Sequence, residues 1–175
     1  MPQRIAVSHM FGALAVTLVG IAEFVHYREA VGGPGVVKMV ALGFETLFGA
    51  LTITGSFMAF GKLQGFVTGR PVTFPGQKLV NAAVFLGAVA LYAALVLTQS
   101  GGATGDSGLV MFGLMTALAL VIGVTLVLPI GGADMPVVVS LLNSYAGLAA
   151  SATGFAIGNN ILIVAAALSA SRSMY

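Results

Sequence analysis

The run MVALGFETLFGALTITGSFMAFG, residues 39–61, is the clearest indication of the fold class of this chain. It lies between Lys38 and Lys62 and contains one ionisable residue, Glu45. As a helix, its 23 residues extend about 34 Å, enough to cross the ~30 Å hydrocarbon core of a bilayer. The run therefore predicts a membrane-spanning helix.

Comparable apolar runs lie on both sides of this one, each bounded by charged or turn-forming residues. The strands of a membrane β-barrel would need alternating segments of ~10 residues, a pattern absent from the sequence. We therefore expect an all-α integral membrane protein, a single transmembrane domain over residues 1–175 with about six helices in a bundle. The expected spans are about 5–24, 37–60, 79–99, 108–130, 135–157 and 160–172.

The sixth expected span is short. After the interruption at residues 158–160, about 11 apolar residues precede Arg172, which corresponds to roughly 17 Å of helix. A helix of this length cannot cross the bilayer unaided. We expect that it tilts into an unusual packing, or that the chain has been cut inside or just after it.

The composition agrees with a membrane protein. Of 175 residues, 58% are hydrophobic and 7% are charged, whereas a soluble domain has roughly 25% charged residues. So few charges exclude a soluble enzyme, a disordered chain and a nucleic-acid binder. With no cysteine and two histidines, we expect no metal site. The partner that this composition implies is the lipid bilayer.

The basic residues predict the orientation of the chain in the membrane. With six spans, one side carries five basic residues and the other carries two, so we expect both termini in the cytoplasm. A secretory signal over residues 1–22 is the alternative, but no small-x-small cleavage site follows the apolar run. The five basic residues on the expected cytoplasmic side are Arg4, Lys62, Arg70, Lys78 and Arg172, and the two on the opposite side are Arg28 and Lys38.

Away from the ends of the expected spans, His9 and Glu45 are the only His, Asp, Glu, Lys or Arg residues. Such residues are costly in hydrocarbon and usually mark function. Thr52 and Ser56 follow Glu45 by seven and eleven residues, so all three share one face of the second helix. Two interpretations of Glu45 remain open, a structural partner between helices and a carboxylate on a proton pathway.

Charge spacing places three polar residues at one depth. His9, Ser56 and Asn143 each lie five to nine residues from a charged residue on the cytoplasmic side, very roughly 8–14 Å along a helix. An imidazole titrates near neutrality, and hydroxyl and amide groups hydrogen-bond either of its forms. The three residues are therefore candidates for a proton relay. The alternative for His9 is a hydrogen bond between helices.

The fifth expected span has small residues along one face, a pattern typical of close helix packing. Gly154-x-x-x-Gly158 is part of it, and Asn143 lies at its edge. Asp134 before Pro136 is expected to cap this helix, or to form a gating ion pair with Arg172. The small residues of this face are Ser140, Ser144, Gly147, Ser151, Gly154 and Gly158.

Three stretches carry a resemblance to a known family. The run GGADMPVVVSLLNSY, residues 131–145, resembles the signature of the β subunit of proton-translocating NAD(P) transhydrogenase, in its membrane domain (domain II). TGSFMAFGKLQG, residues 54–65, is similar to a second motif of that family. MPQRIAVSH, residues 1–9, resembles the start of the helix that carries its channel histidine.

The resemblance implies roles for individual residues. His9 falls on the protonatable channel histidine of the family, Asn143 on the asparagine implicated with it, and Ser56 on a serine of the same pathway. Asp134 matches the aspartate near the junction with the NADP(H)-binding domain. The secondary candidates are Glu45, Asp134, Ser144 and Arg172.

The resemblance also implies what this chain lacks. Family β subunits have further helices before this region and a soluble NADP(H)-binding domain after it, so we expect a fragment of a larger polypeptide. No glycine-rich phosphate-binding turn is present, so we expect no cofactor on this chain, with NADP(H) and NAD(H) bound by other domains. The implied partners are a companion subunit with an NAD(H) domain and further helices, in a dimeric complex of the bacterial inner membrane.

The sequence therefore predicts a proton-translocating oxidoreductase segment, coupled to hydride transfer between NADH and NADP⁺ on soluble domains. The alternative is a secondary transporter or channel module whose polar helix face lines a substrate path. A third interpretation is a structural anchor in which the polar groups only join helices.

Overall fold

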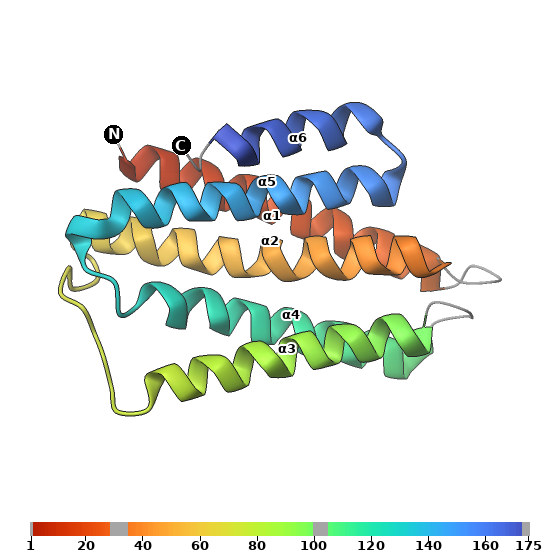
Figure 1. Cartoon of the computed structure of the whole chain (residues 1–175), viewed down its shortest axis with the longest axis horizontal. Coiled ribbons are helices and arrows are strands. Elements are labelled where there is room, and N and C mark those ends of the chain that lie inside the picture. Colours follow the sequence, from red (N-terminus) through yellow and green to blue (C-terminus); the bar gives the residue numbers. More distant parts are fainter. Residues whose placement is uncertain (1, 29–34, 100–104, 173–175) are drawn as a thin grey trace.

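The structure is a computed structural model that describes residues 2–28, 35–99 and 105–172 (Figure 1). Within these ranges the chain forms helices and turns without a β-strand, which confirms the expected all-α class. Five helices are long and apolar enough to cross a membrane. The elements are α1 (Pro2–Arg28), α2 (Gly35–Gln64), α3 (Gln77–Gln99), α4 (Asp106–Val127), the 3-10 turn η1 (Gly132–Asp134), α5 (Met135–Ile157) and α6 (Asn160–Arg172).

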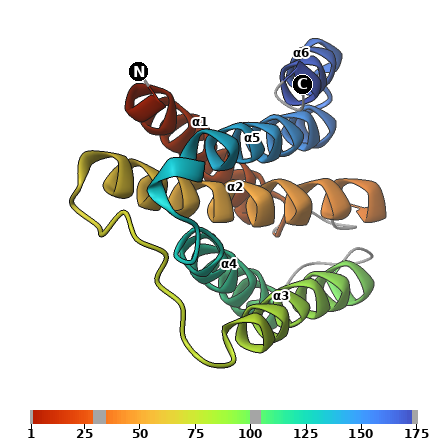
Figure 2. The same ribbon diagram turned by 60° about the vertical axis from the view of Figure 1, so that its left-hand side comes forward.

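Helix α2 lies at the centre of the bundle. α1, α4 and α5 pack against it, α3 packs mainly on α4, and α6 packs on α5 (Figures 1 and 2). Both ends of the described chain lie at the same end of the bundle, which also holds the α2–α3 and α4–α5 connections (Figure 1). We call this the terminal end.

Glycine lets α4 approach α2 closely. A Cβ added to Gly123 would collide with the carbonyl oxygen of Leu51 and the hydroxyl of Thr54. At this crossing the Thr54 hydroxyl donates a hydrogen bond to the Leu120 carbonyl oxygen on α4, at 2.7 Å. The contact therefore joins the two helices by backbone packing and by one side-chain hydrogen bond, as is common between membrane helices.

The small residues of α5 form its seam with α6. A Cβ on Gly147 would meet the backbone of Ala170 at 2.9 Å, and a Cβ on Gly154 would meet that of Ile163 at 2.8 Å. Gly158, however, does not pack there: it has a φ of 71° and ends α5, and its Cβ position is open. The expected close packing is therefore correct for Gly154 and wrong for Gly158, which is needed for the left-handed turn.

Helix α6 has 13 residues, about 20 Å of helix, so it is shorter than the ~30 Å hydrocarbon core. It folds back beside α5 (Figure 2). The amide of Asn159 donates to the Gly154 carbonyl oxygen at 2.8 Å, and the Asn159 side chain accepts from the amide of Leu162 at 3.1 Å. Asn159 thus satisfies backbone groups at the end of one helix and the start of the next.

At the terminal end, Lys62 closes the last turn of α4. Its ammonium donates to the carbonyl oxygens of Val127 (3.2 Å), Leu128 (2.5 Å) and Ile130 (2.7 Å), and the residue is 5% exposed. The carbonyl oxygens of Val127 and Leu128 also accept from the amides of Ile130 and Val72, respectively, and the negative end of the helix dipole favours a cation there. Lys62 is therefore a buried structural cation, whereas the sequence indicated only a span boundary.

Replacement of Gly123 by alanine tests the α2–α4 crossing. We expect Gly123→Ala to destabilise the protein by about 1–3 kcal/mol, because the added methyl group overpacks the contact with α2. Gly113→Ala on the same helix is the matched control, since its Cβ position is open. Thermal unfolding of the purified variants in detergent measures both, and equal unfolding temperatures would show that the crossing is not tight.

Candidate functional site

A polar groove of about 360 Å³ lies between α1, α5 and α6. We call it the His9 groove. Most of its lining residues are glycine, alanine or serine, whose small side chains leave the space between the helices unfilled. Its lining residues are Ser8, His9, Gly12, Val16, Asn143, Ala146, Gly147, Ala150, Ala166 and Ser169.

His9 and Asn143 line this groove from different helices, α1 and α5. Both side chains are half-buried, and His9 Nδ1 is buried without a hydrogen-bond partner among the described residues. The groove brings together an imidazole and a carboxamide, two of the three groups that the charge spacing placed at one depth. Ser8 and Ser169 also line it, and nothing in their sequence spacing distinguished them.

Ser56 does not line the His9 groove. It lies on α2, is 1% exposed, and its hydroxyl oxygen has no hydrogen-bond partner within the described ranges. Ser56 nevertheless lies near the depth of Asn143, because the residues that precede them in the sequence, Gly55 and Leu142, pack against each other. The structure therefore groups His9 with Asn143 and leaves Ser56 buried on α2.

Glu45 is fully buried on α2, with an exposed fraction of 0%. Gly20 of α1 packs against its carboxyl group, where a Cβ would collide with Oε1. Thr153 of α5 lies beside it, but the Thr153 hydroxyl donates to the Ala149 carbonyl oxygen at 3.1 Å. Neither carboxyl oxygen has a hydrogen bond within the described residues, nor does the hydroxyl of the adjacent Thr46.

The shared face of α2 points into the bundle. Glu45, Thr52 and Ser56 are all buried. Thr52 donates to the Phe48 carbonyl oxygen at 2.6 Å, one turn earlier in its own helix. Glu45 precedes Ser56 by eleven residues, roughly 16 Å along the helix, so it lies in the half of the bundle away from the terminal end.

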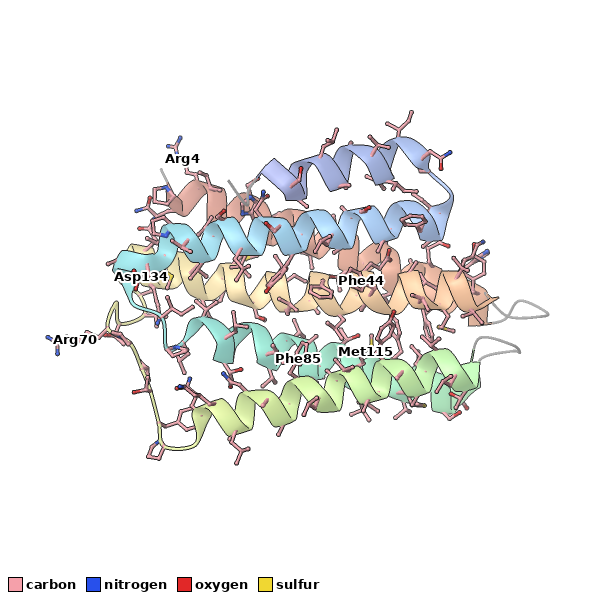
Figure 3. The ribbon with its side chains drawn as sticks, in the orientation of Figure 1. Arg4, Phe44, Arg70, Phe85, Met115 and Asp134 are labelled. Atoms are coloured by element: carbon pink, nitrogen blue, oxygen red, sulfur yellow. The ribbon has the colours of Figure 1, made fainter. Side chains whose placement is uncertain are left out.

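The secondary candidates lie outside the His9 groove. Asp134 is at the N-cap position of α5, but its side chain makes no capping hydrogen bond and is exposed at the terminal end, as Arg70 is (Figure 3). The Ser144 hydroxyl donates to the Ser140 and Ala170 carbonyl oxygens, both at 3.3 Å, within the α5–α6 seam. The Arg172 side chain is outside the described residues.

The described residues form helices and turns. They contain no strand–turn–helix unit of the kind that binds a dinucleotide. They also contain no group of three His, Asp or Glu side chains placed to hold a metal ion. An imidazole and a carboxyl group, those of His9 and Glu45, are groups that can each bind and release a proton.

Comparison with known proteins identifies the family. The family described as "NAD(P) transhydrogenase beta subunit" matches residues 1–174. Two relatives from Rhodospirillum rubrum, one of them from a named strain, are called NAD(P) transhydrogenase subunit beta. Each is 41% identical over 172 residues, which is 96% of this chain and 35% of the relative. The chain thus spans about a third of the length of these relatives.

The fold and the groove define a helical membrane protein with ionisable side chains inside its spans. The match over nearly the whole chain identifies the family to which this membrane protein belongs. The chain belongs to the NAD(P) transhydrogenase beta subunit family, as the three sequence motifs predicted.

Cysteine cross-linking tests the groove, because the chain has no cysteine of its own. We expect a short thiol-reactive cross-linker to join cysteines introduced as His9→Cys and Asn143→Cys. Phe11→Cys with Asn143→Cys is the control, because Phe11 is 57% exposed and does not line the groove. Peptide mass spectrometry measures the yield, and equal yields from the two pairs would contradict the arrangement.

Proposed function

We propose that this chain is the proton-translocating membrane segment of an NAD(P) transhydrogenase. In this proposal the whole complex is an oxidoreductase and translocase, and hydride passes from NADH to NADP⁺ on soluble domains outside this chain. The membrane segment moves a proton across the bilayer in step with that transfer. The observation that carries the proposal is the His9 groove, where a titratable side chain and an amide share one polar space inside the membrane.

His9 is the proton carrier of the proposal. Among the described residues it is the only ionisable one that lines the groove, and an imidazole binds and releases protons near neutral pH. Asn143 hydrogen-bonds either form, because its amide both donates and accepts. At about 360 Å³ the groove has room for several waters, each occupying ~30 Å³, to carry a proton between these groups.

The buried face of α2 extends the proposed pathway. Ser56 has a hydroxyl without a partner, near the depth of Asn143, and Glu45 has a carboxyl group without a partner in the other half of the bundle. A carboxyl group that only joined helices would need a hydrogen-bonding partner on the facing helix. Gly20, the α1 residue packed on Glu45, has no side chain to supply one, and the Thr153 hydroxyl of α5, which lies beside the carboxyl group, donates to the Ala149 carbonyl oxygen instead. We therefore favour the pathway role of Glu45.

The rest of the proposed assembly rests on family membership and charge. The name beta subunit implies a companion subunit, and we propose that it carries the NAD(H) domain and further helices, in a dimeric complex of the bacterial inner membrane. The excess of basic residues at the terminal end supports cytoplasmic termini. If the nucleotide state shifts the proton affinity of His9, protonation must shift nucleotide affinity by the same free energy.

Substitution of His9 tests the proton role. In the complete complex reconstituted into proteoliposomes, we expect His9→Ala to lower coupled hydride transfer and proton movement by on the order of 100-fold, the contribution of a positioned acid–base group. His26→Ala, at an exposed histidine, is the control and should leave both rates unchanged. His9→Asn distinguishes a relay from helix packing, since normal pumping with this non-titrating residue would overturn the proposal.

Glu45→Gln tests the extension of the pathway. Glutamine keeps the size of the carboxyl group but cannot exchange a proton, so we expect proton movement to fall while the complex still assembles. Glu23→Gln, at a half-buried glutamate of α1, is the control. Proton movement and the yield of assembled complex are measured together. Normal pumping by Glu45→Gln would make Glu45 a neutral buried group with no transfer role.

A further inference from the structure

A second cavity, of about 390 Å³ and with a mostly apolar lining surface, lies at the terminal end beside the start of α3. It is separate from the His9 groove and from Glu45. Thr73 and Lys78 line it together with two amide side chains, Gln77 and Asn81, and Pro129 closes it from the end of α4. None of its lining residues is acidic.

The N-terminus of α3 lies beside this cavity. Gly76, in a left-handed conformation with a φ of 82°, turns the chain into the helix. The amide of Gln77 donates to the Phe74 carbonyl oxygen at 3.2 Å, and that of Val80 to the Gly76 carbonyl oxygen at 3.0 Å. The amides of Lys78 and Leu79, between them, have no acceptor among the described residues. Free amides and the helix dipole favour an anion at such an end.

Gln77 gives independent support for a ligand. It is 7% exposed, and its Nε2 is a buried donor without a hydrogen-bond partner within the described ranges. A buried donor left without a partner costs about 1–3 kcal/mol, and an acceptor in the cavity would remove that cost. Lys78 adds a positive charge at the same wall. A side-chain amide and a cation therefore line one cavity beside the N-terminus of a helix.

Asn81 adds an acceptor. Its Nδ2 donates to the Thr125 carbonyl oxygen at 3.2 Å, whereas its Oδ1 is buried without a partner in the described chain. A ligand that pairs a negative group with a nearby hydroxyl donor would satisfy Gln77, Lys78 and Asn81 together. An anionic phosphate diester with a hydroxylated headgroup has this combination.

We propose that this cavity binds the phosphate group of an anionic membrane phospholipid. The buried amide donor and the cation of the cavity suit a phosphate group, and the position of the cavity favours a lipid as the source of that group. Immediately along α3, large apolar side chains face outward, with Leu79 76% exposed and Leu86 65% exposed. The cavity thus lies where the apolar surface of α3 begins, at the level of a headgroup whose acyl chains would run along the helix. Basic side chains near the membrane surface attract such lipids.

Lipid binding to the complete, delipidated complex tests the site. Phosphatidylglycerol is titrated in detergent, and native mass spectrometry measures the bound lipid. We expect Lys78→Gln to weaken binding about five-fold, and Gln77→Leu about ten-fold, because a hydrogen bond to a charged group is lost. Arg70→Gln is the matched control: it removes an equal charge at the same end, but Arg70 does not line the cavity.

Each result bears on the proposal. Loss of binding in the Lys78 and Gln77 variants, with the Arg70 variant unchanged, supports it. Equal losses in the Lys78 and Arg70 variants would overturn the site, because the attraction would then be a general surface charge. Phosphatidylcholine binding as tightly as phosphatidylglycerol would also overturn it. Complete displacement of the lipid by inorganic phosphate at equal concentration would make free phosphate the ligand and overturn the lipid source.

Discussion

Close contact of helix backbones around α2 is the constraint on which the rest of the structure depends. In hydrocarbon, apolar side chains gain little from meeting one another, so packing and a few hydrogen bonds must hold the helices together. On one face of α2, side chains of α2 pack against Gly20 of α1, and a side chain of α1 packs against Gly49 of α2. On another face, Gly123 brings the backbone of α4 against α2. Because α2 is enclosed in this way, five of its polar side chains are buried, those of Glu45, Thr46, Thr52, Ser56 and Lys62.

The same packing separates two kinds of polar environment. Around Glu45 the helices meet so tightly that Gly20 packs directly on the carboxyl group. Around His9 the facing residues are equally small, but α1 and α6 diverge over α5 and leave a groove (Figure 2). A tight seam fixes a group in one position, whereas a groove admits water and partners. The proposed pathway therefore combines a fixed carboxyl group with a more accessible imidazole.

Much of this arrangement follows from the sequence, and the reasons are physical. The length of the run over residues 39–61 and the scarcity of charge predict helices in a membrane, and charge spacing predicts depth. Depth says nothing about rotation between helices, which is why His9 and Asn143 share the groove while Ser56 does not. The spacing of small residues likewise did not distinguish Gly154, in the α5–α6 seam, from Gly158, which ends α5.

At the terminal end, hydrogen bonds link the start of α5 to the α2–α3 connection. The amide of Gly132 donates to the Gly69 carbonyl oxygen at 2.8 Å, and Lys62 holds the end of α4, so the turn before Asp134 is tied to the α2–α3 connection. From Asp134, α5 continues without interruption past Asn143, about 14 Å along the helix. One continuous helix therefore joins the α2–α3 connection at the terminal end to Asn143 in the His9 groove.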